Sequence, residues 1–286
     1  MTAGSESCRD VLGTVLAELR RTNFAGRRVS LLEGALVVAG GGGIALGTGR
    51  AADAAVLSGI GALGLIDDLL EPRQRRAGGV VSKGLRGHLG ALRQGRITTG
   101  AAKALGIPVL ALAGAATAPH PRGGPMVLAD GALAAGCANL ANLLDLRPGR
   151  ALKVVLPAAA ALAVLAPLRP AEDLRSASGR SLALAALVPG ALALPTDLRE
   201  HGMLGDAGAN VLGAAVGTAA ARTLPRPVRL ALLTVVVALT LASEKVSFSA
   251  VIDTTPALRA VDLLGRREPP RDGEAPEPGS GTVGDR

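Results

Sequence analysis

The 286-residue sequence contains no tryptophan, no tyrosine and only two phenylalanines. It is nonetheless 49% hydrophobic, it contains 39 glycines, and its mean hydropathy is +0.38. A core in water built from Ala, Leu, Val and Gly, almost without rings, would bury little large apolar surface. Helices in lipid favour such small residues, because backbones must approach closely where no hydrophobic effect drives their packing. The composition therefore indicates a polytopic membrane protein and argues against a soluble one.

Cysteine is almost as scarce as the aromatic residues. Cys8 and Cys137 are too few for a disulfide framework or a zinc site. The net charge of +8 does not indicate a nucleic-acid partner, because no basic stretch is interleaved with the aromatic residues that stack on bases. Membrane proteins acquire the same bias by keeping Lys and Arg in their cytoplasmic loops.

Eight apolar stretches are candidates to cross about 30 Å of hydrocarbon. They are residues 29–49, 51–70, 104–119, 125–144, 151–168, 181–195, 207–221 and 228–242. We therefore expect an all-α fold, a polytopic integral membrane bundle of about eight or nine membrane helices.

The two ends of the chain differ from this central region. Residues 8–21 carry apolar side chains at helical spacing with charges between them, which predicts an amphipathic segment in the membrane interface. From Arg266 onward the sequence is rich in Pro, Gly and charge, which predicts disorder. The expected organisation is an interfacial segment over residues 1–28, a transmembrane domain over residues 29–250 and a cytoplasmic C-terminal segment over residues 251–286, disordered from about residue 266.

The connecting loops differ in charge, and this difference orients the chain. Basic residues concentrate in residues 73–103 and 147–153, and the number of crossings between these loops places them on one side, together with the loop 197–206. The opposite loops carry fewer basic residues. Because cytoplasmic loops retain Lys and Arg, we expect the first set to be cytoplasmic in a multi-pass protein of the plasma membrane.

Three polar groups lie at predicted span ends on this cytoplasmic side. They are Asp67-Asp68, Asn139-x-x-Asn142-x-x-Asp145, expected on one helical stripe, and Gly205-Asp206-Ala207-Gly208. An even number of crossings separates each group from the next, so all three should meet in one cleft on the cytoplasmic face. Adjacent carboxylates at a helix C-terminus sit against the negative end of its dipole and need a positive charge nearby. Arginines could supply it, and so could Mg²⁺, which takes one or two carboxylates plus substrate phosphates.

The order of these motifs resembles the polyprenyl-phosphate N-acetylhexosamine-1-phosphate transferase family, glycosyltransferase family 4, which includes phospho-N-acetylmuramoyl-pentapeptide transferase. Two further stretches are similar to the family. Asn23-Phe24-Ala25-Gly26-Arg27 resembles its Asn-x-x-Gly-Arg motif, and Ser243-Glu244-Lys245-Val246-Ser247 resembles its Glu-x-Val-Ser stretch. The resemblance implies transfer of a sugar-1-phosphate from a UDP-sugar to polyprenyl phosphate at the cytoplasmic membrane face, with Mg²⁺, in envelope polysaccharide or peptidoglycan synthesis.

Site roles follow from the resemblance, motif by motif. Asp206 would hold Mg²⁺, with Asn142 as a ligand or near-ligand. Asp67 would receive the proton of the lipid phosphate or orient its attack. Asp68 and Asp145 would complete the catalytic group. Such a site must bring two polyanions together, so a metal and a basic loop would offset their repulsion.

Four further residues are expected to bind substrate. Lys83 and His88 lie in a basic, glycine-containing loop that offers cation and backbone donors suited to a diphosphate. Asn139, the first residue of the second motif, and Arg147, which lies just after it, are also expected to bind substrate. The expected partners are the membrane, a UDP-sugar and polyprenyl phosphate, and the sequence leaves a homodimer open.

The sequence also departs from the family pattern. The position of a second Asp in Asp-Gly-x-Asp-Gly is Pro148, and residues 251–267 contain no His where the family carries a His-rich motif. The alternative hypothesis is therefore a catalytically silent relative that binds polyprenyl phosphate or scaffolds envelope synthesis. A transporter would instead predict ionisable residues at mid-membrane and an internal repeat, neither of which is evident.

Overall fold

The computed structural model describes residues 18–76, 99–166 and 174–267, and most of these residues are helical. The long helices are α2 (Leu32–Gly47), α3 (Ala51–Arg76), α5 (Thr99–Ala116), α6 (Gly124–Leu144), α7 (Arg150–Leu165), α8 (Leu174–Leu198), α9 (Gly205–Thr223) and α10 (Arg226–Ser243). Two short helices, α11 (Phe248–Thr254) and α12 (Pro256–Leu263), follow. Each of the eight apolar stretches therefore coincides with one of these helices over most of its length.

Four of these helices are long and apolar enough to cross a membrane. They are α5, α6, α8 and α10, whereas α2 is a shorter apolar helix. The described part of the chain thus fits a helical membrane protein, as its composition predicts.

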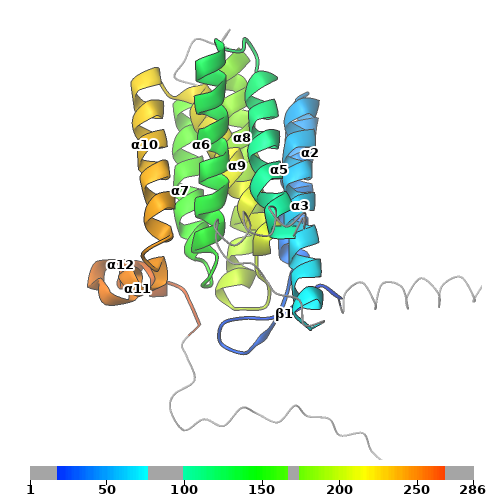
Figure 1. The fold of residues 1–286 in the computed structure, drawn as a ribbon, viewed down its shortest axis with the longest axis vertical. Coiled ribbons are helices and arrows are strands. Elements are labelled where there is room, and N and C mark those ends of the chain that lie inside the picture. Colours follow the sequence, from blue (N-terminus) through cyan, green and yellow to red (C-terminus); the bar gives the residue numbers. More distant parts are fainter. Residues whose placement is uncertain (1–17, 77–98, 167–173, 268–286) are drawn as a thin grey trace, which may run out of the picture.

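The long helices stand side by side, and α9 occupies the centre (Figure 1). It contacts α2, α3, α5, α6, α7 and α8, and nearly all of its Gly- and Ala-rich sequence is buried. Small side chains allow this close packing of one helix by many others. The outermost helix, α10, packs chiefly on α6 and exposes apolar residues such as Val235 and Leu241.

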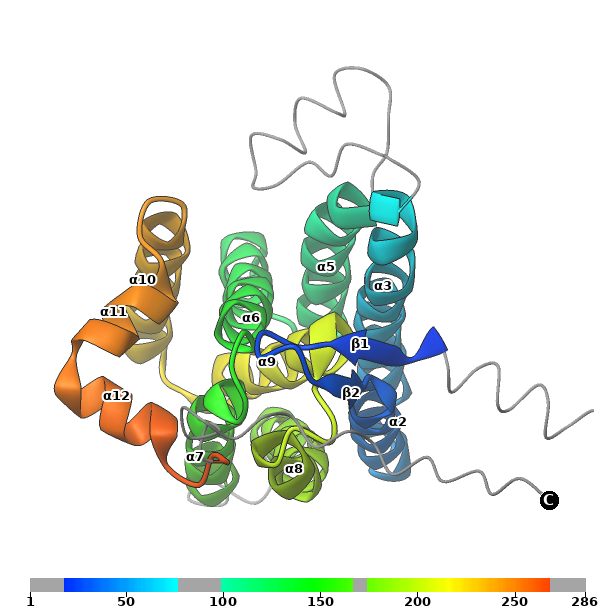
Figure 2. The same ribbon diagram turned by 90° about the horizontal axis from the view of Figure 1, so that it is seen from below.

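A small β-hairpin lies across one end of the bundle, which we call the hairpin end (Figure 2). Strand β1 (Arg20–Thr22) pairs with β2 (Arg28–Ser30) in an antiparallel register. The turn between them is held by Asn23, whose Oδ1 accepts hydrogen bonds from the backbone N–H groups of Ala25 at 3.0 Å and Arg27 at 2.9 Å. Gly26 supplies the positive φ of +75° that this turn requires.

The hairpin corrects one sequence-based expectation. The amphipathic helix predicted over residues 8–21 does not extend to its end, because Arg20 and Arg21 lie in a strand. Residues 8–17 lie outside the described residues. The strand forms because β2 also pairs with the loop after α8: the Ser30 N–H donates to the His201 carbonyl at 3.2 Å, and the Met203 N–H donates to the Ser30 carbonyl at 3.0 Å. Tertiary pairing therefore overrides the local helical pattern.

Residues 251–267, expected as part of a cytoplasmic segment, contain most of α11 and all of α12, which lie beside the lower end of α10 (Figure 1). Asp262 attaches α12 to the start of α7, because its carboxylate accepts hydrogen bonds from Arg150 at 2.7 and 3.1 Å. Burial alone would raise the pKa of Asp262, but these bonds and the charge of Arg150 hold the pKa below its ordinary value.

Buried ion pairs tie the helices together at the other end of the bundle, which we call the opposite end. Asp53 at the start of α3 pairs with Arg222 at the end of α9, and Asp130 in α6 pairs with Arg175 and Arg229. These arginines are nearly inaccessible to solvent. Their positive charge is therefore neutralised by carboxylates inside the protein.

Candidate active site

Three of the predicted carboxylates meet at the hairpin end. Asp67 lies in the C-terminal half of α3, which continues beyond the predicted span to Arg76, and Asp206 lies in the first turn of α9; both form ion pairs with Lys103 from the first turns of α5. The distance from Lys103 Nζ to Asp67 Oδ2 is 2.7 Å. Two carboxylates from different helices therefore converge on one cation.

Asp68 caps the start of α9 from another helix. Its two carboxylate oxygens accept hydrogen bonds from the backbone N–H groups of Asp206 and Ala207, each at 3.2 Å. These are free donors at the positive end of the α9 dipole, and a carboxylate satisfies them well. Gly205 permits the arrangement, since it adopts a φ of +59° and a Cβ there would lie 2.8 Å from Asp68 Oδ2.

The close approach of α3 to α9 depends on Gly64, one turn before Asp67. A Cβ at Gly64 would lie 2.6 Å from both the N and the Cα of Ala207. Any larger residue there would separate the two helices and move Asp67 away from Asp206. The sequence Gly64-x-x-Asp67-Asp68 thus combines a contact point with the polar groups that it positions.

A second set of carboxylates surrounds this group. Withdrawal from water raises the pKa of Asp145, which directly follows α6, and repulsion by Asp197, Asp206, Asp68 and Glu33 raises it further. The repulsion means that these carboxylates all lie within electrostatic reach of Asp145. The interior of this end therefore contains a cluster of carboxylates, and Lys103 lies among them as a cation.

Asp197 and Glu33 have partners of their own. Asp197 Oδ2 accepts a hydrogen bond from the Gly149 N–H at 2.8 Å, and Glu33 Oε2 accepts one from the Thr196 hydroxyl at 2.5 Å. The other oxygen of Glu33 is buried without a hydrogen-bond partner among the described residues. These bonds hold the end of α8 against α2 and against the loop before α7.

The Asn-x-x-Gly-Arg motif holds the loop that leads to Asp206. Arg27 forms an ion pair with the buried Glu200, to which its Nε donates at 2.8 Å, and Asn23 Nδ2 donates to the same carboxylate at 2.5 Å. The neighbouring Arg21 donates to the backbone carbonyl of Asp68. The hairpin therefore contacts α3, which carries Asp67 and Asp68, and the α8–α9 loop, which leads to Asp206 in the first turn of α9.

The other residues of the second motif lie differently. Asn142 is half-buried in the last turn of α6, next to the carboxylate-rich end. Asn139 is exposed, and its Nδ2 lies 3.5 Å from the Thr240 hydroxyl of α10. Arg147 stacks on the ring of Phe24, with 4.1 Å between its guanidinium carbon and the ring centroid. In the described structure, Asn139 and Arg147 thus contact α10 and the hairpin turn and not the carboxylates.

The expectation of a single stripe over residues 139, 142 and 145 is therefore wrong for its first member. A helix turns about 100° per residue, so six residues leave Asn139 and Asp145 about 120° apart around the axis. Asn139 faces α10 for this reason. Lys83 and His88 lie outside the described residues.

Two residues of the site were not singled out from the sequence, Lys103 and Glu200. Lys103 counted only toward the charge of the basic loop, although it lies among Ala and Leu inside a helix, where an ionisable group usually has a partner. Glu200 gave no such signal, since its position in a short polar loop is typical of an exposed residue.

A divalent cation fits the central group in part. Mg²⁺ takes one or two carboxylates together with substrate oxygens, and Asp67 and Asp206 already reach a single cation, the Lys103 ammonium. Within residues 18–76, 99–166 and 174–267, no group of three or more His, Cys, Asp or Glu side chains is arranged to hold a metal ion. A Mg²⁺ ion here would need substrate oxygens, or an amide such as that of Asn142, to complete its coordination.

Comparison with known proteins gave no match: no protein-family model, no curated protein and no solved structure is similar to this chain.

Proposed function

We propose that the protein is a multi-pass membrane transferase that moves a sugar-1-phosphate from a UDP-sugar to polyprenyl phosphate, with its site on the cytoplasmic face. The convergence of Asp67 and Asp206 on Lys103, with Asp68 on the backbone of α9, carries this proposal. These residues lie far apart in the sequence and belong to three different helices. Their meeting supports a site for a reaction between phosphate groups.

Each central residue has a role in this reaction. Asp67 receives the proton of the lipid phosphate, or orients its attack on the diphosphate of the nucleotide-sugar. Lys103 holds Asp67 and Asp206 in place and supplies positive charge where two polyanions approach each other. Asp68 fixes the start of α9, which positions Asp206.

Asp206 and Asn142 are the residues that would hold Mg²⁺, with Asp67 close by. When bound, the metal would offset phosphate charge and stabilise the charge that develops on the transferred group. Asp67, Asp68 and Asp206 carry three formal negative charges, and Lys103 with the neighbouring Arg21 carries two positive ones, so the formal excess of negative charge supports a cation as the partner.

A catalytically silent relative is the second candidate. Lys103 already neutralises part of the charge of Asp67 and Asp206, so the central group is held together without a metal. Pro148 also replaces a carboxylate of the family motif. Such a protein would bind polyprenyl phosphate or scaffold envelope synthesis.

An assay of the purified full-length protein tests the proposal. The protein is incubated with radiolabelled UDP-N-acetylhexosamines and undecaprenyl phosphate, with and without Mg²⁺, and labelled lipid is extracted. We expect Mg²⁺-dependent label in the lipid. Asp67→Asn should lower turnover by about a hundredfold or more with a smaller effect on substrate binding, because it acts mainly in the transition state. Asp206→Asn should weaken the response to Mg²⁺.

Asp253→Asn is the matched control, because it is the same Asp-to-Asn substitution at an exposed position on α11. It should behave as the wild type. If the wild type transfers no sugar-phosphate from any UDP-sugar, while Asp67→Asn and Asp206→Asn still fail to complement a deletion, the residues serve binding or architecture and the silent relative is the better description.

A further inference from the structure

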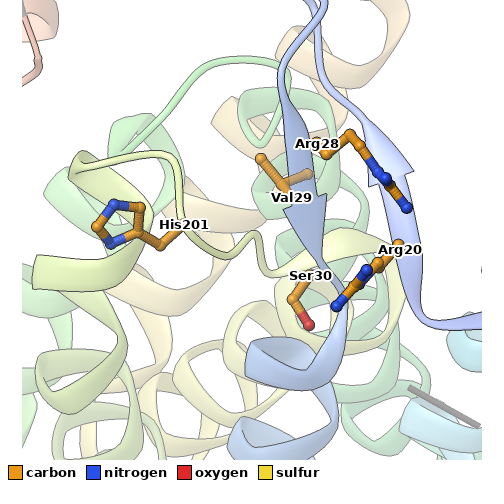
Figure 3. A pocket seen from close by; sticks show the side chains of 5 residues that line it. All are labelled: Arg20, Arg28, Val29, Ser30 and His201. Atoms are coloured by element: carbon orange, nitrogen blue, oxygen red, sulfur yellow. The ribbon is translucent and has the colours of Figure 1, made fainter. Parts of the chain in front are cut away.

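A pocket of about 390 Å³ lies at the hairpin end, apart from the carboxylates. Figure 3 shows the side chains that line it: Arg20 and Arg28 from the hairpin, Val29 and Ser30 from β2, and His201 from the loop after α8. Its volume lies in the range of small-molecule sites. The lining contains two cations and no carboxylate.

The two arginines that line the pocket form no ion pair within the described part of the protein. Of the hairpin arginines, Arg21 donates to the Asp68 carbonyl and Arg27 pairs with Glu200. Arg20 and Arg28 are exposed and form no ion pair with any described residue. Two guanidinium groups are thus free to bind a ligand at the pocket.

Strand register places these charges on one face. Arg20 pairs with Ser30 and Thr22 pairs with Arg28, so Arg20 and Arg28 are diagonal neighbours, about 7–8 Å apart at the backbone. Like charges at this separation repel each other unless an anion lies between them. Two guanidinium groups on one face of the hairpin, both lining the pocket, suit a phosphate group, since each can bind its oxygens through two parallel hydrogen bonds.

The remaining polar groups suit the same ligand. The Ser30 hydroxyl oxygen accepts a hydrogen bond from the Leu32 N–H at 3.2 Å, so its own hydrogen remains available for donation. His201 forms the other wall, and its carbonyl accepts from the Ser30 N–H. The two walls are therefore fixed to each other before a ligand arrives.

From this geometry we propose that Arg20, Arg28, Ser30 and His201 form a binding site for a phosphate group, carried either by a soluble nucleotide or diphosphate or by a lipid headgroup. The inference goes beyond the transferase proposal and does not depend on it. The same loop continues from His201 to Asp206, so a ligand bound here lies next to the segment that carries a central carboxylate.

Calorimetric titration of the full-length protein in a neutral detergent tests the soluble source, with inorganic pyrophosphate and UDP as ligands. The double variant Arg20→Gln/Arg28→Gln should bind them at least about tenfold more weakly, the loss expected when charge-assisted hydrogen bonds are removed. Arg28→Gln alone should lose an intermediate amount, which keeps the test valid if the double variant does not fold.

The matched control is Arg199→Gln/Arg259→Gln, which removes the same charge from exposed arginines outside the pocket. It should bind within about twofold of the wild type. Native mass spectrometry tests the lipid source by comparing adducts of dioleoyl phosphatidic acid and dioleoyl phosphatidylcholine. A lipid ligand predicts phosphatidic acid adducts that the control retains and Arg20→Gln/Arg28→Gln loses.

Two results would overturn the site. Equal losses in both double variants would show attraction by net charge alone. A wild type that binds pyrophosphate, UDP and phosphatidic acid no more tightly than Arg20→Gln/Arg28→Gln would show that the pocket takes no phosphate. Because binding is measured without turnover, failure of the transferase assay does not affect either outcome.

Discussion

Lys103 is the residue that connects three helices at the centre of the candidate site. Its ammonium lies between Asp67 and Asp206 and is mostly withdrawn from solvent. A group in this position neutralises two carboxylates, and in the proposed reaction it would meet a phosphate oxygen. The balance of charge at the site therefore depends on one side chain.

We expect Lys103→Gln to reduce turnover by about a hundredfold, the scale of a lost electrostatic contribution in an enclosed site. It should also lower the Mg²⁺ concentration needed for half-maximal activity, because Asp67 and Asp206 lose their competing cation. The radiolabel transfer assay measures both quantities, with the exposed Lys245→Gln as control. Unchanged turnover in Lys103→Gln would contradict the role.

Asp145 gives a prediction about stability and pH. Its pKa is raised because burial and neighbouring carboxylates disfavour the ionised form. The folded protein therefore loses stability as the pH rises from the ordinary pKa of Asp through the raised value. Asp145→Asn is neutral at every pH, so it should unfold at a higher temperature than the wild type at pH 8, with a smaller difference at pH 5. Thermal unfolding in detergent measures this, and an equal difference at both values would contradict the raised pKa.

Individual residues of the site were predicted unevenly from the sequence. Asp67 and Asp206 could be paired because both occur at predicted span ends separated by an even number of crossings, and the structure brings them together, although α3 continues past Asp67 to Arg76. Asn139 was placed wrongly because spacing by three drifts around a helix. Glu200 could not be found, since its burial is caused by a hairpin that the sequence pattern did not predict.

At the scale of elements, helix positions followed from composition, whereas the strands did not. Apolar length defines a helix in lipid almost by itself, because every backbone polar group must be satisfied within the segment. A strand of three residues carries no such signal. Strand β2 forms because its backbone is hydrogen-bonded to β1 on one side and, through Ser30, to His201 and Met203 on the other. The contacts of Ser30 with His201 and Met203 join residues about 170 positions apart, and no local pattern encodes them.

The contact of α3 with α9 predicts the effect of one methyl group. Gly64→Ala would place a Cβ 2.6 Å from the backbone of Ala207, so the helices must separate. We expect destabilisation of about 1–3 kcal/mol, as is typical of overpacking, and a loss of transfer activity as Asp67 moves away from Asp206. Thermal unfolding and the transfer assay measure the two effects.

The control for this prediction is Gly43→Ala in α2, where a Cβ would meet nothing within 4 Å. It should match the wild type or be slightly more stable, because Ala favours a helix more than Gly does. If Gly64→Ala and Gly43→Ala behave alike, the close approach of α3 and α9 does not limit the site.

At the scale of the whole molecule, the two ends of the bundle use their arginines differently. At the opposite end, Arg222 and Arg229 are buried in ion pairs with Asp53 and Asp130. At the hairpin end, Arg20 and Arg28 are exposed without ion-pair partners among the described residues. The count of basic residues per loop therefore understates the difference in free positive charge between the two ends, because part of the positive charge at the opposite end is neutralised by buried carboxylates.

Free positive charge is retained on the cytoplasmic side, so the hairpin end should face the cytoplasm. The test uses single cysteines in a background with Cys8→Ser and Cys137→Ala. Arg147→Cys and Arg199→Cys report on the hairpin end, and Gly123→Cys and Ala177→Cys report on the opposite end. An impermeant maleimide should label only the second pair in intact cells and all four after permeabilisation. Labelling of Arg199→Cys in intact cells would show the opposite orientation. The carboxylates would then face the outside of the cell, away from the cytoplasmic supply of UDP-sugar.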